Sequence, residues 1–394
     1  MIRMNILVLC NIDLENKWGD YTRVFSLMQE LTKRGHKIFL FIIKSDIKKP
    51  RVSYFNENGI EIIEIHPYSI GFSGKKGISR HINYLISIPT IIKEASKIIS
   101  KHNIDYVYSY MPGTGSSLPA IKIKSKFKIP LILDLADMYS MIRPKRIIDK
   151  SFKVSDKIIV ITDYLKQDLL QKGILDKKIF QIPNGVNFEI FNPSLYDFEE
   201  IKTLRSSFHT DKLVVFSGAL QDLNILINSA TNIVKKIPTV KFIIIGDHRI
   251  PSKSKNSWEK IVKEKNLEKY FKFLGKKPKE EIPKYLLCAD VCVDCFPNEP
   301  YFAAALPIKL LEYGACKKPV VATNVSETAK IISHGKFGYL AEADNHLEYG
   351  DFIIKLLSNP EKAQEMGQNF YKFVKEKYPW TEITSNLEKL LMKN

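Results

Sequence analysis

Short runs of branched apolar residues alternate with longer amphipathic stretches from one end of the chain to the other. Such runs are expected of strands buried on both faces of a parallel sheet. The stretches between them repeat apolar residues at helical spacing, which is typical of helices that cover the faces of the sheet. The pattern therefore predicts an α/β protein with parallel sheets.

The expected strands fall into two groups along the chain. The first group is Asn5–Cys10, Lys37–Ile43, Glu61–Ile65, Asp105–Ser109, Pro130–Asp134, Lys157–Ile161 and Lys178–Ile182. The second group is Leu213–Ser217, Val240–Gly246, Phe271–Leu274, Val291–Cys295 and Pro319–Ala322. A chain of 394 residues is too long for one core. The repetition of one pattern predicts two domains, joined by residues 187–210.

The segment from Ala305 to Thr323 combines a cation, a carboxylate and a helix start. Pro307 suits the first helical position, and Gly314 with Lys317 and Lys318 is expected to end the helix. Lys309 and Glu312 are three residues apart and share one face. A helix N-terminus favours anions, so the arrangement suits a ligand with phosphates and sugar hydroxyls. An ordinary surface Lys–Glu pair is the alternative.

A second segment, Lys177 to Pro193, reads K-K-I-F-Q-I-P-N-G-V-N-F-E-I-F-N-P. Together, the two segments resemble the retaining glycosyltransferases of family 4, which carry I-P-N-G-V-D…F-x-P and E-A-M-A-x-G-x-P-V-V-A. The resemblance implies the GT-B fold, with two Rossmann-like domains whose parallel sheets face each other across a cleft. It implies an acceptor-binding domain over 1–190, completed by a last helix within 378–394, and a donor-binding domain over 191–377.

The resemblance assigns roles on the donor side. Glu312 matches the glutamate that accepts the ribose hydroxyls, and Lys309 matches a cation that contacts the diphosphate. Ala304 stands where the family has its first glutamate, and Glu299 is a weak substitute. Strand ends are where ligands bind in open parallel sheets. Gly218, Gly246 and Arg249 lie at or just after the ends of expected strands and are therefore nucleotide-binding candidates. Lys276 is a further candidate because Leu274-Gly275-Lys276 resembles the family's F-L-G turn, and Leu306 and Pro307 are candidates at the start of the helix that carries Lys309.

On the acceptor side, Asp134 and Asp137 end an expected strand and resemble the family's D-x-x-D-x-W/Y stretch. Carboxylates there suit sugar hydroxyls or an attacking nucleophile, so both are candidate catalytic residues beside Lys309. Ala136 replaces a histidine found in many relatives, and Gly19 alone remains of a glycine pair. No D-x-D triplet occurs, so we expect no metal ion and no cofactor.

Charge is unevenly distributed. The net charge is +17, and residues 1–190 contain 30 Lys and Arg against 18 Asp and Glu. Apolar residues lie among the basic ones between Lys75 and Lys101, which suits an anionic membrane surface. A general lysine bias explains the charge about as well, and no nucleic-acid-binding motif accompanies it.

Five cysteines favour a reducing compartment. Cys288, Cys292 and Cys295 fall on or next to an apolar strand without a fourth ligand at zinc spacing, which predicts buried free thiols. No segment reaches membrane-spanning length.

We therefore expect a cytoplasmic hexosyltransferase that acts on a lipid-linked or cell-surface glycan precursor in polysaccharide biosynthesis. The alternatives are a nucleotide-sugar 2-epimerase of the same fold and a catalytically degenerate partner protein.

Overall fold

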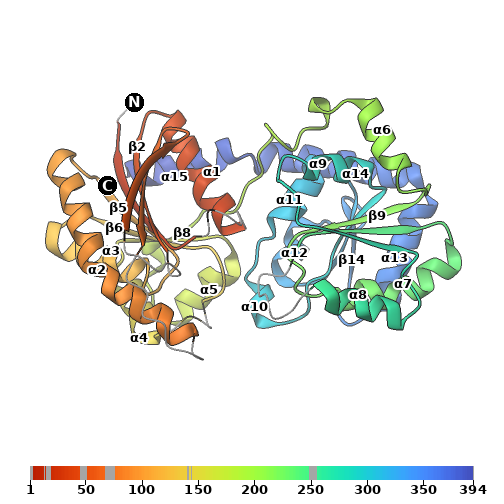
Figure 1. Ribbon diagram of the computed structural model, residues 1–394, viewed down its shortest axis with the longest axis horizontal. Helices are drawn as coiled ribbons and strands as arrows, with labels where there is room; N and C mark the ends of the chain where they lie inside the picture. Colours follow the sequence, from red (N-terminus) through yellow and green to blue (C-terminus); the bar gives the residue numbers. More distant parts are fainter. Residues whose placement is uncertain are drawn as a thin grey trace. The chain divides into compact units, whose positions relative to one another are not determined.

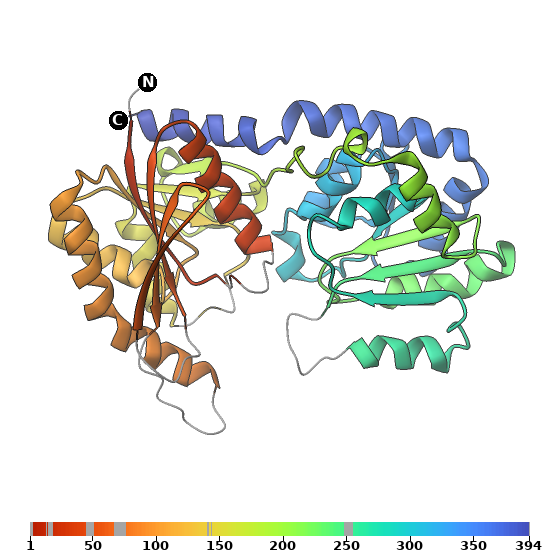
Figure 2. The same ribbon diagram turned by 45° about the horizontal axis from the view of Figure 1, so that its top comes forward.

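The structure is a computed structural model that describes residues 3–12, 14, 19–44, 51–66, 76–139, 142, 144–247 and 255–393. It divides into two compact units, shown in Figures 1 and 2. Unit 1 comprises Met1–Pro183 and Trp380–Asn394, and unit 2 comprises Asn184–Pro379. The expected boundary at residue 190 lies a few residues beyond Pro183. The final helix belongs to unit 1, as the resemblance implies.

The described part of unit 1 contains an eight-stranded sheet in the order β3-β4-β2-β1-β5-β6-β7-β8. All neighbours are parallel except β3 and β4. The strands are β1 (Asn5–Cys10), β2 (Lys37–Ile43), β3 (Arg51–Glu57), β4 (Ile60–His66), β5 (Tyr106–Tyr110), β6 (Leu131–Leu135), β7 (Lys157–Val160) and β8 (Ile179–Gln181).

Strand β3 was not expected from the apolar runs, because it is an edge strand with four of its seven residues exposed. It pairs antiparallel with β4 through a two-residue turn at Asn58 and Gly59, both with positive φ. An Asn-Gly pair is the strongest short hairpin signal in a sequence, because both turn residues need φ > 0. The sequence therefore indicated the turn between β3 and β4, but β3 itself has no run of apolar residues that would have predicted a strand.

Helices cover both faces of this sheet. Helices α1 (Gly19–Lys33) and α15 (Trp380–Met392) pack together on one face, and α2 (Lys76–Lys101), α3 (Ser117–Phe127) and α4 (Lys145–Val154) lie on the other (Figures 1 and 2). Helix α5 (Asp163–Gln171) packs on β7 and β8. The short 3-10 helix η1 (Asp176–Lys178) leads into β8.

The described part of unit 2 contains a six-stranded parallel sheet in the order β11-β10-β9-β12-β13-β14. Its strands are β9 (Leu213–Ser217), β10 (Lys241–Ile245), β11 (Phe271–Gly275), β12 (Val291–Asp294), β13 (Val320–Thr323) and β14 (Gly338–Ala341). Strand β14 was not expected, because it has four residues and starts with Gly338.

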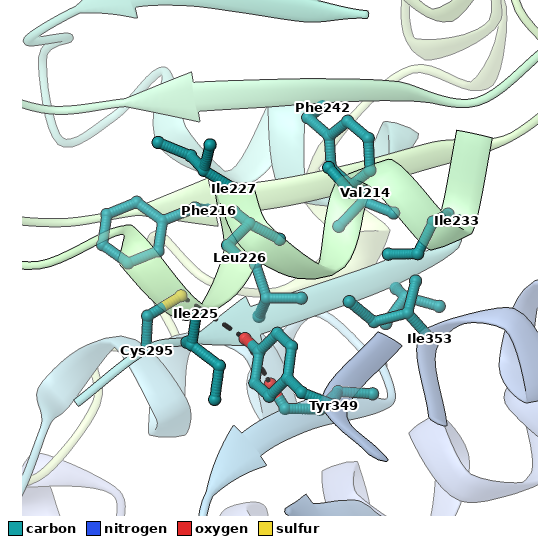
Figure 3. Packing of buried hydrophobic residues seen from close by; sticks show 14 of the residues in the cluster. Val214, Phe216, Ile225, Leu226, Ile227, Ile233, Phe242, Cys295, Tyr349 and Ile353 are labelled. Carbon is teal, nitrogen blue, oxygen red and sulfur yellow. Dashed lines mark hydrogen bonds between the residues drawn. The ribbon is translucent and has the colours of Figure 1, made fainter. Parts of the chain in front are cut away.

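The helices of unit 2 alternate with its strands. They are η2 (Pro193–Leu195), α6 (Phe198–Ser206), α7 (Asn224–Lys236), α8 (Lys255–Glu264), α9 (Ile282–Cys288), α10 (Pro300–Ala303), α11 (Ile308–Ala315), α12 (Ser326–Ile331), α13 (His346–Ser358) and α14 (Pro360–Lys377). Figure 3 shows one core layer, in which residues of α7 meet the sheet and Tyr349 of α13 contacts Cys295.

Helix α11 differs in two details from the expected one. It begins at Ile308, so Pro307 precedes the first helical residue instead of occupying it. Gly314 lies inside the helix and does not end it. A Cβ at Gly314 would lie 2.7 Å from Val374 Cγ2 and 3.0 Å from Phe370 Cδ1 on α14. Gly314 is therefore a packing residue that lets α11 and α14 approach closely.

Candidate functional site

The strand order of unit 2 places the site. In the sheet, β10 and β11 lie on one side of β9, and β12, β13 and β14 lie on the other. The direction in which successive strands are added to the sheet therefore reverses between β9 and β12. In open parallel sheets, ligands bind beyond the carboxyl ends of the strands at this switch point. The residues that follow β9 and end β12 are Gly218 and Asp294.

Three glycines form a side-chain-free edge at the ends of β9, β10 and β11. Gly218 N donates to Ile245 O at 2.9 Å, and Gly246 N donates to Gly275 O at 2.9 Å. Gly246 has φ +140°, and a Cβ there would lie 1.8 Å from Gly218 O. Only glycine fits at Gly246, and a phosphate group can approach the backbone here without meeting side chains.

Lys309 reaches this edge from the first turn of α11. Its Nζ lies 2.6 Å from Asp294 Oδ1, and its side chain is 12% exposed. The ammonium also lies 4.4 Å from the ring centre of Phe216 and 4.7 Å from that of Phe296. An ideal Cβ at Gly218 would lie 3.2 Å from Lys309 Cδ. The cation is therefore held beside the glycine edge by a carboxylate and two aromatic rings.

Asp294 is a site residue that the sequence analysis missed. Its side chain is fully buried, and Oδ1 accepts from Cys295 N at 3.0 Å as well as from Lys309. Within the described residues, Oδ2 is buried without a hydrogen-bond partner. The sequence did carry a signal, because an acidic residue at the end of the apolar run Val291–Cys295 requires a partner if it is buried.

Glu312 lies one turn after Lys309 and pairs with Lys279, whose Nζ is 3.8 Å from Glu312 Oε1. Burial raises the pKa of Glu312, and the nearby Lys279 opposes that shift. Burial lowers the pKa of Lys279, and Glu312 opposes that shift in turn. Lys279, which follows β11, was not expected from the sequence. Both charged residues of α11 in the site thus face an opposite charge, Lys309 from the end of β12 and Glu312 from the turn after β11.

Polar contacts fix α11 against the sheet. The Tyr313 hydroxyl accepts from Ser217 N at 2.9 Å and lies 3.3 Å from Val293 O, which connects the helix to β9 and β12. Asn184 Nδ2 donates to Leu306 O at 2.8 Å. The side chains of Leu306 and Pro307 are buried, so their part in ligand binding is limited to backbone atoms.

The other candidates of unit 2 are more dispersed. Lys276 is exposed just beyond β11, where its backbone follows the Gly275 edge. Arg249 lies outside the described residues. Ala304 is fully buried and presents no polar side chain, whereas Glu299 is exposed at the start of α10. The family's first glutamate therefore has no counterpart at position 304.

In unit 1, the structure gives Asp134 a different role from the expected one. Asp134 is fully buried, and both of its oxygens accept from Arg23 at 2.9 Å. The Tyr108 hydroxyl donates to Asp134 Oδ2 at 2.6 Å. A carboxylate enclosed in this way cannot contact a substrate, so Asp134 is structural. Arg23 also donates to the carbonyls of Ile182 and Pro183, both at 3.0 Å.

Asp137 remains a candidate for the acceptor side. It is partly buried beyond the end of β6, and its Oδ1 accepts from Met138 N at 2.8 Å. Because Asp134 is enclosed, Asp137 is the acidic residue of the D-x-x-D stretch that a substrate can reach.

The thiols are as expected. Cys10, Cys288, Cys292, Cys295 and Cys316 are all free and buried, and burial raises the pKa of Cys292 and Cys295 to about 12. Thiols in this state are unreactive and act as small apolar groups.

Family models match both halves of the chain. The model of glycosyltransferase family 4 matches residues 21–190, and that of the glycosyl transferases group 1 matches residues 197–373. The chain is 28% identical over 374 residues to a glycosyltransferase of Methanocaldococcus jannaschii, with 92% of each chain covered. It is 28% identical over 255 residues to the poly(ribitol-phosphate) alpha-N-acetylglucosaminyltransferase of Staphylococcus aureus, covering 63% of this chain and 45% of that one.

Solved structures of the same fold cover the whole chain. HepE of Anabaena, determined with UDP and glucose, superposes with a TM-score of 0.74 at 15% identity, and each chain is covered completely. The sucrose-phosphate synthase of Thermosynechococcus elongatus gives a TM-score of 0.76 at 17% identity, with 98% of each chain covered.

Among the described helices, none combines the length and apolar content needed to cross a bilayer.

Proposed function

Since this chain belongs to the glycosyltransferases of family 4, nucleotide-sugar-dependent enzymes with the GT-B fold, we propose which ligands its two units bind. Unit 2 binds a nucleoside-diphosphate sugar, and unit 1 binds a glycan or lipid-linked acceptor with a free hydroxyl. The sugar is transferred with retention of its anomeric configuration, as the resemblance implies.

One observation carries the donor assignment. The glycine edge formed by Gly218, Gly246 and Gly275 extends from the switch point of the sheet, where Gly218 lies beside Lys309. Glu312 follows one helical turn later. Backbone amides and one cation suit a diphosphate, and a carboxylate one turn away suits the two hydroxyls of a ribose.

The proposed mechanism rests on stabilising the leaving group. Negative charge develops on the diphosphate as the bond to the sugar breaks, and Lys309 and the backbone amides near Gly218 stabilise that charge. Asp137 contacts the acceptor hydroxyl in unit 1. We propose that neither a metal ion nor another cofactor takes part.

The acceptor proposal draws on relatives. Among them are the poly(ribitol-phosphate) alpha-N-acetylglucosaminyltransferase named above and WaaG, a glycosyltransferase of lipopolysaccharide biosynthesis with a TM-score of 0.70. The name of the first gives a poly(ribitol-phosphate) as its acceptor, and the second is involved in lipopolysaccharide biosynthesis. We propose a similar acceptor, used at the cytoplasmic side of the cell membrane, where nucleotide sugars and free thiols both occur.

A thermal-shift panel of UDP-, GDP-, CDP- and ADP-sugars tests the donor assignment. We expect one base to raise the melting temperature and Glu312→Gln to abolish the rise. Incubation of the labelled donor with a lipid extract should then give a labelled product. Conversion of the donor to its epimer without any acceptor would contradict sugar transfer and support an epimerase. Binding without any product would support a degenerate partner protein.

A further inference from the structure

We propose that Asp294 is a positioning residue of the donor site, which acts through Lys309 by holding its ammonium group beside the glycine edge. The inference rests on the proposed function, because it takes Lys309 as the cation that contacts the diphosphate. Nothing in the family motifs quoted above assigns a role to position 294.

The geometry excludes direct contact between Asp294 and a ligand. The side chain is fully buried at the end of β12, and the Lys309 ammonium group pairs with its Oδ1 atom. The Lys309 side chain retains a small exposed fraction, whereas the Asp294 side chain retains none. Asp294 therefore influences a bound diphosphate only through the position and charge of Lys309.

A lysine side chain has four rotatable bonds and would otherwise sample many positions. The Phe216 and Phe296 rings restrict the ammonium at 4.4 and 4.7 Å, and Asp294 supplies the directional contact at 2.6 Å. One ammonium hydrogen is used by Asp294, which leaves the others for phosphate oxygens. The cation is thus preorganised before the donor arrives, which is the condition for stabilising charge that develops during the reaction.

The other acidic residue of this strand provides a contrast. Asp290 precedes β12 at its amino end and pairs with Arg205 at 2.9 Å, but its side chain is 31% exposed. Leu213 N donates to its Oδ2 atom at 2.7 Å. Asp290 thus has the same chemistry on the same strand, at the end opposite the site, and Asp290→Asn is a matched control.

The experiment compares Asp294→Asn, Lys309→Met, the double variant and Asp290→Asn in the full-length protein. For each, calorimetry gives the dissociation constant of the nucleoside diphosphate that the panel identifies, kinetics give the turnover number and the KM for the donor, and heating gives the melting temperature. Methionine keeps the unbranched shape and most of the length of the lysine side chain without its charge. The double variant removes both charges and so leaves no buried ion without a partner.

We expect Asp294→Asn to lower turnover about 10- to 100-fold, by analogy with the loss found when a group that orients a metal-ligating side chain is removed. The donor KM should change less than threefold. In the Lys309→Met background, the same substitution should leave turnover unchanged and raise the melting temperature. Asp290→Asn should keep wild-type turnover.

Two results would overturn the inference. One is turnover of Asp294→Asn within twofold of wild type. The other is an equal loss of turnover from this substitution with and without Lys309, because Asp294 would then act by another route. If Lys309→Met changes neither diphosphate affinity nor turnover, the proposed diphosphate site itself is wrong, whatever Asp294 does.

Discussion

The two charged residues of α11 that face the donor site are both paired within the protein, Lys309 with Asp294 and Glu312 with Lys279. A buried ion without a partner is costly, so a charge can be kept ready for a ligand only if an opposite charge lies beside it. The same rule accounts for Arg23 and Asp134 in unit 1, where the pair is closed to any ligand.

Glu312→Gln tests the ribose contact. The amide keeps the shape but weakens a charge-assisted hydrogen bond, so the free energy of nucleotide binding should become less favourable by roughly 1.5–3 kcal/mol. Titration calorimetry with the bare nucleoside diphosphate measures this change. An unchanged dissociation constant would remove Glu312 from the site.

The pH dependence of nucleotide affinity gives a second measure of Glu312. Burial raises its pKa above the ordinary value of 4.5. The contribution of this carboxyl to stability is therefore fully present at low pH and is lost as the pH rises through its folded-state pKa. Ribose binding needs the ionised form, so affinity should fall on acidification at a pH above 4.5. Glu312→Gln should remove this dependence, and a wild-type affinity that is constant between pH 7 and 4.5 would contradict the assignment.

Gly246→Ala tests the glycine edge. Its Cβ would lie 1.8 Å from Gly218 O, so β9 and β10 must separate and the free energy of unfolding should fall by about 3 kcal/mol or more. Gly275→Ala on the neighbouring strand is the control, because no atom lies within 4 Å of its Cβ. It should lose only about 1 kcal/mol through its positive φ. Similar losses in thermal or chemical unfolding of the two variants would show that close approach is not what Gly246 provides.

Sequence motifs indicated Lys309 and Glu312 as candidate site residues but did not indicate the residues with which they pair. Lys309, Glu312 and Gly218 were found because they lie at a helix start or a strand end, which local patterns reveal. Asp294 ends β12 and Lys279 lies in the turn between β11 and α9, so their proximity to α11 depends on the order of strands in the sheet. The same limit explains Asp134, whose enclosure by Arg23 depends on the docking of α1.

At the level of elements, buried strands were predicted well because each is a short apolar run. Strands β3 and β14 were missed because one is exposed and the other is short and starts with glycine. Of the residues expected to end α11, Lys317 lies just beyond the helix with positive φ, whereas Gly314 lies inside it and packs against α14. From the sequence alone, a glycine that ends a helix cannot be distinguished from one that lets two helices pack closely.

Helix α15 is held on unit 1 by a carboxylate that contacts two basic residues. Glu388 lies 2.9 Å from His36 Nε2 and 3.0 Å from Arg34. Burial alone would raise the pKa of Glu388, but the His36 hydrogen bond and the Arg34 charge outweigh it and lower the pKa. Glu388 therefore stabilises the folded state at pH values above its ordinary pKa of 4.5, and this stabilisation is lost as the pH falls through its folded-state pKa.

Glu388→Gln should lower the free energy of unfolding of unit 1 by about 1–3 kcal/mol at pH 7 and should reduce its sensitivity to acid. Glu382→Gln, at an exposed position in the first turn of the same helix, is the control. Thermal unfolding at several pH values measures both. Equal melting temperatures of the two variants at pH 7 would mean that the contacts of Glu388 do not hold α15.

At the scale of the whole molecule, charge and exposed apolar residues coincide on α2. Leu85 and Ile86 are 49% and 40% exposed, and Lys93 and Lys97 follow at helical spacing on the same exposed side. Lys97 is paired with Glu94, so part of its charge is neutralised. Lys75 and the side chains of Lys76 and Arg80 lie outside the described residues. An apolar stripe that continues into basic residues is suited to the surface of an anionic membrane.

We therefore predict that the protein binds anionic vesicles and that binding weakens as salt rises. Each basic residue near the surface contributes on the order of 1 kcal/mol.

Co-sedimentation with anionic and with neutral vesicles is compared for wild type and two five-fold glutamine variants of equal charge. The test variant replaces Lys75, Lys76, Arg80, Lys93 and Lys97, and the control replaces Lys122, Lys126, Lys128, Lys145 and Lys150, which are exposed in the same unit. A general lysine bias predicts equal losses from both, whereas a surface formed by α2 predicts release of the test variant alone. Equal sedimentation of wild type with neutral and anionic lipid would rule out an electrostatic contribution.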